Sequence, residues 1–95
     1  MATGTIKRNK SIVTYDHEFT ATYTSGTIGS RGGQDSVESP YPADKLIGIS
    51  VIYIASSNEY NVLAFRSSAT LYCNFYRAST NAVTAKATVR FAYAI

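Results

Sequence analysis

The sequence is short of the residues from which disulfides, metal sites and catalytic centres are built. Its 95 residues include one cysteine, one histidine, two prolines and no tryptophan. Because Cys73 stands alone, no internal disulfide can form, which excludes the small secreted scaffolds that several bridges hold together. His17 and Cys73 also supply too few ligands for a zinc site. We therefore expect no metal, no cofactor and no catalytic residues.

Charge and long apolar runs are scarce as well. Charged residues make up 16% of the chain, and the formal net charge is +3. Lys7, Arg8 and Lys10 form one basic cluster, but the remaining cations are scattered singly, unlike the basic face of a nucleic-acid-binding protein. No apolar run approaches the roughly 20 residues of a transmembrane helix, and no apolar signal-peptide core is present. These absences predict a soluble protein made in a reducing cytoplasm, without a membrane or nucleic-acid partner.

What the sequence does contain favours β-structure. Apolar residues make up 45% of the chain, and eight tyrosines with four phenylalanines favour sheet over helix. The length allows one domain over residues 1–95, with enough apolar content for one core. We predict an all-β fold, a small jelly-roll-like antiparallel β-sandwich without significant helix.

A hydrophobic period of two locates the strands. Segment 4–15 predicts two short strands or one interrupted edge strand, and 18–24 predicts a half-buried strand. Short polar turns, one of them including Ser56 and Ser57, separate four later strands. These strands indicate an antiparallel meander over Leu46–Ala55, 60–66, 69–77 and 83–95.

Two of these strands have one clearly apolar face. In segment 83–95 the odd-numbered residues are apolar and the alternating residues include Thr, Lys and Arg, so we expect one buried face. Cys73 alternates with Leu71 and Phe75 and is expected to be a buried, unreactive thiol.

Residues 25–44 interrupt the strand pattern. Glycine, serine and proline recur through this segment, and almost no apolar residues lie between them. A connection of this length is uncommon inside a compact domain unless it is functional, an arm or disordered. We predict a long Gly/Ser-rich loop over 25–44, either mobile or ordered by a partner.

Two middle strands are apolar on both faces. This holds for Leu46–Ala55, rich in isoleucine and valine, and for segment 60–66. A strand that is apolar on both faces must be covered on both, and a sandwich of this size has few elements to spare. We therefore predict a homo-oligomer, expected to be a trimer, whose interface includes Ile52, Ile54 and Val62.

The segment 69–77 carries the side chains best suited to recognition. Tyr72, Asn74 and Tyr76 share the face opposite the apolar set, and Arg77 follows them. Tyrosine offers rigid, amphipathic contact area, and asparagine offers both donors and acceptors. We take these four residues as ligand or interface candidates. Three interpretations stay open: a subunit interface, an outer sheet face without a ligand, and a site for a sugar ring.

His17 is flanked by two carboxylates but is not predicted to be catalytic. On a strand, Asp16 and Glu18 point to one side and the imidazole to the other. That separation removes the orienting carboxylate from the ring, so the segment does not form a Ser-His-Asp arrangement. We expect a structural histidine.

The second half of the chain resembles a family of viral proteins. The resemblance rests on Tyr41-Pro42, on Leu46-Ile47-Gly48-Ile49, on the turn at Asn58 and on the alternating strand 87–95. Together these residues are similar to the C-terminal β-sandwich modules of bacteriophage tail and receptor-binding proteins, over 41–95. The resemblance implies a trimeric virion component in a tail fibre, tip or baseplate, with host-surface recognition as its role.

The expected function is therefore assembly and surface recognition. We expect a non-enzymatic phage virion module that contacts copies of itself, other virion proteins and a host cell-surface glycan. Two alternatives remain: a freestanding carbohydrate-binding module, and a small nucleic-acid-binding β-barrel that uses Lys7, Arg8, Lys10 and the tyrosines.

Overall fold

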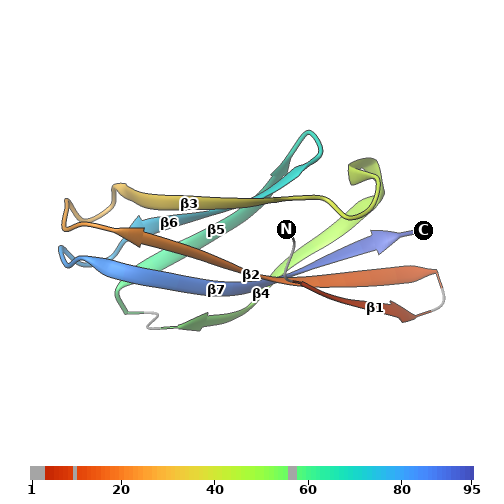
Figure 1. Ribbon diagram of the computed structural model, residues 1–95, viewed down its shortest axis with the longest axis horizontal. Helices are drawn as coiled ribbons and strands as arrows, with labels where there is room; N and C mark the ends of the chain where they lie inside the picture. Colours follow the sequence, from red (N-terminus) through yellow and green to blue (C-terminus); the bar gives the residue numbers. More distant parts are fainter. Residues whose placement is uncertain (1–3, 10, 56–57) are drawn as a thin grey trace.

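The computed structural model describes residues 4–9, 11–55 and 58–95 of the chain. Lys10, Ser56 and Ser57, which belong to the predicted basic cluster and to one predicted turn, lie outside the described residues. Strands account for most of the described chain, with one short 3-10 helix (Figure 1). The elements are β1 (Thr5–Asn9), β2 (Ile12–Tyr23), β3 (Arg31–Glu38), η1 (Ala43–Lys45), β4 (Leu46–Ala55), β5 (Tyr60–Ser67), β6 (Thr70–Arg77) and β7 (Val83–Ala94).

Two antiparallel sheets pack face to face, which confirms the predicted all-β sandwich. One sheet has the strand order β1-β2-β7-β4, and the other has the order β3-β6-β5. Figure 1 shows the three-stranded sheet lying over the four-stranded one, with β3 above β2. The edges of the two sheets therefore meet at two sides of the sandwich, where β2 lies beside β3 and where β4 lies beside β5.

The predicted meander over the last four strands is wrong in its pairing. β5 and β6 do form a hairpin, but β4 pairs with β7 in the other sheet. Two stacked sheets lie about 10 Å apart, and an extended residue spans about 3.3 Å. A connection of a few residues, such as 78–82, can thus cross between sheets as readily as it can close a hairpin. Strand spacing alone does not distinguish the two.

The predicted loop over 25–44 is also corrected, because β3 occupies its centre. β3 pairs with β6 from Glu38 to Arg31, with one register shift at the glycine pair. A Cβ on Gly32 would lie 2.6 Å from the Tyr23 ring, and one on Gly33 would lie 2.7 Å from the Ala21 methyl group. The two glycines therefore allow β3 to approach β2 closely, and they do not break the strand.

The core lies between the sheets and follows the predicted alternation. Odd-numbered residues of β7 are buried from Ala85 to Tyr93, and β2 and β6 contribute their own alternating sets. Cys73 is fully buried, as predicted. The largest fully buried side chains are Tyr15, Tyr60, Tyr93, Phe19, Phe75 and Phe91.

One buried hydroxyl connects the two sheets. The ring of Tyr60 on β5 is 1% exposed, and its hydroxyl contacts the backbone of both β4 and β7. It accepts a hydrogen bond from the Lys86 N–H at 3.0 Å and lies near the carbonyl oxygens of Ala55 and Lys86. Tyr60 thus satisfies backbone groups that the irregular end of β4 would leave without partners.

We expect Tyr60→Phe to lower the free energy of unfolding by about 1–3 kcal/mol, because the Lys86 N–H loses its buried acceptor. The control is Tyr53→Phe, whose ring is 61% exposed on β4, and which should change stability by less than about 0.5 kcal/mol. Urea denaturation followed by circular dichroism measures both. Equal stability of the two variants would show that the Tyr60 hydroxyl does not stabilise the sandwich.

Candidate functional site

The outer face of the three-stranded sheet carries the predicted recognition residues. Tyr72, Asn74 and Tyr76 on β6 lie on the side opposite Leu71, Cys73 and Phe75. The structure thus brings three of the four candidates together on one surface. We call this surface, with its neighbours Gln34 on β3 and Leu63 and Phe65 on β5, the aromatic face.

Side-chain contacts hold the aromatic face in a fixed arrangement. Gln34 donates to the Asn74 side-chain carbonyl at 2.7 Å, and the Asn74 amide donates to the Tyr76 hydroxyl at 3.1 Å. The Phe65 and Tyr72 rings stack with their centroids 5.2 Å apart. Asn74 is 6% exposed, so its amide is occupied by these neighbours. Among the described residues, the Tyr76 hydroxyl accepts from Asn74 and donates to no acceptor.

Sequence reasoning missed Gln34 and Phe65 as members of this face. Gln34 lies in the segment predicted to be a loop, and it meets Asn74 only because β3 pairs with β6. Phe65 lies opposite Tyr72 in the β5–β6 hairpin. A short turn between two strands fixes how they pair, so the turn between the predicted strands 60–66 and 69–77 could have placed Phe65 opposite Tyr72.

Arg77, the fourth candidate, points the other way, and its assignment to this site is corrected. It has the same parity as Leu71 and Phe75, so it projects toward the interior side of the sheet. Its guanidinium lies 5.1 Å from the centroid of the Tyr23 ring. It donates to the Ser30 hydroxyl and to the carbonyls of Thr24 and Arg31 at 2.8–3.1 Å. Arg77 therefore fixes the turn between β2 and β3.

The predicted oligomer interface is only partly on the surface. Ile54 and Val62 pack against the domain's own core, whereas Ile52 is 44% exposed. Val62 lies on β5 opposite the buried Phe75 of β6 and shares its inward face. For β4 the physical reason is two register shifts, between Leu46 and Gly48 and between Val51 and Tyr53. Each β-bulge exchanges the faces of the residues that follow it. The two apolar faces read from the sequence of β4 therefore do not run the length of the strand.

β4 nevertheless remains an exposed apolar edge. It pairs only with β7, so its other edge has no strand partner among the described residues. The strand contains no charged residue. We define the β4 edge by its exposed apolar side chains, which are Ile47, Ile49, Val51, Ile52 and Tyr53, each 37–61% exposed.

The titratable groups of the interior are held in structural contacts. His17 is buried, and its Nδ1 is hydrogen-bonded to the Tyr15 hydroxyl at 2.8 Å. Asp16 lies on the opposite side of β2, where both its carboxylate oxygens accept from Arg90 at 2.8 Å. Within residues 4–9, 11–55 and 58–95, no three His, Cys, Asp or Glu side chains are grouped as metal ligands.

Comparison with known proteins gave no match from which a family or a function could be assigned. No protein-family model, no curated protein and no solved structure matches the chain. In the part of the chain that the structure describes, no helix is long and apolar enough to cross a membrane.

We expect the Cys73 thiol to make the protein less stable at alkaline pH. Burial, with a contribution from Asp35, raises the pKa of Cys73 from 9.0 to about 12. Above pH 9 the unfolded chain loses this proton while the folded chain keeps it. The free energy of unfolding therefore falls by up to about 1.4 kcal/mol per pH unit as the pH rises from 9 toward 12.

Urea denaturation between pH 8 and pH 10.5 checks this, with Cys73→Ala as the reference. Burial also raises the pKa values of Tyr15 and Tyr93, so the difference between wild type and variant isolates the thiol. Parallel pH profiles for the two proteins, or rapid thiol labelling of the folded wild type at pH 8, would contradict the buried assignment.

Proposed function

We propose that this chain is a non-enzymatic assembly module of a phage-type virion, which associates with copies of itself through the β4 edge. The observation that supports it is the chemistry of that edge: a strand paired on one side only among the described residues, with five exposed apolar side chains and no charge. Natural edge strands are protected against further pairing by bulges, which β4 has, and commonly also by charges or prolines. β4 carries neither.

The energetics favour a covered β4 edge. Fully burying one such side chain is worth about 1.5–3 kcal/mol. Covering five half-exposed ones therefore contributes on the order of 4–8 kcal/mol, comparable with the 4–15 kcal/mol that association costs. Side-chain burial alone gives weak association, so the assembly also needs backbone or packing contacts along the strand.

A second copy of the chain is the occupant that fits best. The β4 edge has no charge with which to select a basic or acidic partner, and identical apolar edges meet without stranding a charge. Three copies whose β4 edges converge on a three-fold axis would cover these side chains mutually. The resemblance of 41–95 to phage tail and receptor-binding modules supports this trimeric arrangement and the virion setting.

We expect the wild type to sediment as a trimer, and Ile47→Lys to weaken that trimer at least tenfold without unfolding the subunit, because Ile47 is 60% exposed. Thr84→Lys, an exposed position on the central strand β7, is the matched control and should leave the trimer intact. Val62→Lys should instead unfold the chain, since Val62 packs against the core. Sedimentation velocity over a hundredfold concentration range measures all four proteins.

A folded monomer at every concentration would overturn this proposal. A dimer that Ile47→Lys dissociates would keep the β4 edge as the contact but overturn the three-fold arrangement.

Glycan recognition by the aromatic face is the second candidate function. The observation that favours it is the fixed row of Gln34, Asn74 and Tyr76 beside the stacked pair of Phe65 and Tyr72. Rings and amides in such a row can stack on a sugar and hydrogen-bond its hydroxyls.

We expect any glycan identified on an array to lose at least tenfold in affinity on Tyr76→Ala, and to be unaffected by Tyr53→Ala on β4. Titration calorimetry measures the difference. Absence of array binding by the wild type, at every multivalency tested, would exclude this function.

A further inference from the structure

A three-fold ring places a symmetry constraint on the β4 edge. Away from the axis, neighbouring copies of a cyclic trimer contact each other through different surfaces, so the patch that one copy offers must fit a second patch on the next. A stable interface also covers about 800 Å² of each partner. The ten residues of β4 span roughly 33 Å at a width of about 5 Å, which is too narrow to supply that area alone. A second surface of the chain is therefore needed to receive the β4 edge.

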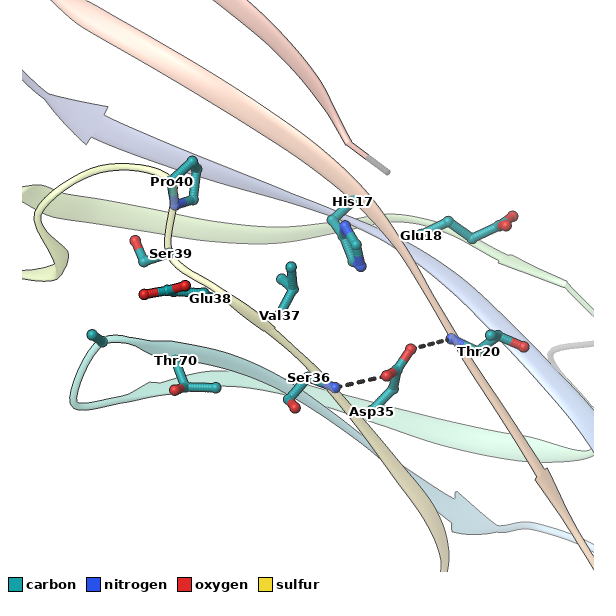
Figure 2. Close-up of a pocket in the computed structure, with 11 residues that line it drawn as sticks. His17, Glu18, Thr20, Asp35, Ser36, Val37, Glu38, Ser39, Pro40 and Thr70 are labelled. Carbon is teal, nitrogen blue, oxygen red and sulfur yellow. Dashed lines mark hydrogen bonds between the residues drawn. The ribbon is translucent and has the colours of Figure 1, made fainter. Parts of the chain in front are cut away.

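The side of the sandwich where β2 lies beside β3 is charged. The Asp35 carboxylate lies between the two strands and accepts from the backbone N–H groups of Thr20 and Ser36, each at 2.8 Å (Figure 2). Glu18 on β2 and Glu38 on β3 are exposed on the outer faces beside it. The β4 edge has no cation to pair with these carboxylates, so covering them would remove charge from water without compensation. This side is therefore a poor match for the β4 edge.

The outer face of the four-stranded sheet is charged as well. Lys86 and Arg90 are exposed there on β7, and both carboxylate oxygens of Asp16 on β2 accept from Arg90 at 2.8 Å. An apolar strand laid over this face would bury these ions without giving them new partners. The face is therefore suited to water and not to the β4 edge.

The outer side of β5 is apolar and uncharged. Leu63 is 52% exposed there, and the Phe65 ring is half-buried. Both share this side of β5 with Asn61, because all three lie opposite outward residues of β6. We call Asn61, Leu63 and Phe65 the β5 strip. The exposed charges of β3, Arg31 and Glu38, stand two strands away.

The β5 strip adjoins the β4 edge around one side of the molecule. β4 and β5 are the last strands of their sheets, and they lie beside each other. Arg66, the one charged residue of β5, alternates with the strip residues, and its guanidinium donates to the Ser68 carbonyl at 2.9 Å. The chain thus has two uncharged apolar surfaces that meet at an angle, one along a side and one on the next face. Adjoining surfaces suit a closed ring, since each copy can present both near the axis.

We propose that the β4 edge of each copy packs against the β5 strip of the next copy, head to tail around the three-fold axis. The contact presupposes the proposed trimer and supplies the second surface that its β4 edge needs. Two uncharged surfaces pair without burying an ion, and an exposed leucine beside a phenylalanine ring gives the isoleucines and valine of β4 a partner of the same chemistry. Docking there covers Leu63 and Phe65, so trimer formation excludes glycan binding at this part of the aromatic face.

We expect Leu63→Glu to weaken the trimer at least tenfold, as Ile47→Lys does, although Leu63 lies in the other sheet. The matched control is Thr84→Glu, which adds the same charge at an exposed position of β7 and should weaken the trimer less than twofold. Sedimentation velocity measures association, and circular dichroism establishes that each variant is folded. A trimer that Ile47→Lys dissociates and Leu63→Glu leaves intact would overturn the contact with the β5 strip and keep the β4 edge.

A photo-crosslink identifies the contacting surface directly, even if Leu63→Glu does not fold. p-Benzoylphenylalanine in place of Tyr53, which is 61% exposed, keeps an aromatic ring on the β4 edge. In a reassembled one-to-one mixture of isotopically heavy and light chains, we expect heavy–light crosslinks from position 53 to residues 60–67. Crosslinks to β4 itself, or to the outer face of β2 and β7, would overturn the β5 strip. A monomer at every concentration, without heavy–light crosslinks, would instead overturn the trimer.

Glycan binding provides the remaining arm. A glycan that binds the wild-type trimer and loses at least tenfold in affinity on Phe65→Ala would show that the β5 strip is open to solvent in the trimer. That result would overturn the contact, whereas glycan binding that is unaffected by Phe65→Ala, or no glycan binding by the trimer, is the result we expect.

Discussion

The structure depends on the position of β7, which must bury its inner face while pairing along both of its edges. β2 covers one edge from Val83 to Ala94, and β4 covers the other. Its inward residues are small at one end and large at the other, and in two pairs the partner strand complements them: Phe19 lies beside Ala87, and Val13 beside Tyr93. A closely packed core requires this kind of size matching between neighbours.

The central place of β7 decides which surfaces are left for recognition. With β7 between β2 and β4, β4 becomes the last strand of its sheet, and among the described residues β2 has a second strand neighbour only from Ile12 to Asp16, where β1 pairs with it. The three-stranded sheet adds β3 over β2 and β5 on the side of β4. The open β4 edge is therefore a consequence of the topology that buries β7.

The sequence predicts where the strands are better than how they pair. The bounds of Leu46–Ala55 agree with β4, and the alternation in 83–95 identifies the buried face of β7, because a period of two reports directly on burial. Pairing depends on contacts between distant segments, and short connections fit several topologies. The bulges in β4 are set by its register against β7, so the faces of Ile54 and Ile52 cannot be read from β4 alone.

The same limit applies to the candidate sites. The period of β6 places Tyr72, Asn74 and Tyr76 together, and it would also have placed Arg77 on the inner side had its parity been followed. Gln34 and Asp35 were out of reach, because glycines that resemble loop residues here allow β3 to lie close against β2. A glycine chosen for close approach and a glycine chosen for a turn look alike in a single sequence.

The two open edges differ in how they are protected, and this difference bears on the kind of complex each can form. At the β2 edge, the Asp35 carboxylate accepts a hydrogen bond from the Thr20 N–H and adds negative charge, so it protects this N–H from pairing with another strand. At the β4 edge no charge intervenes, but two bulges bend and twist the strand. A bent edge cannot continue a flat sheet from copy to copy, which disfavours open-ended stacking. Such an edge is better suited to a closed assembly through its apolar side chains, which is the arrangement that we propose.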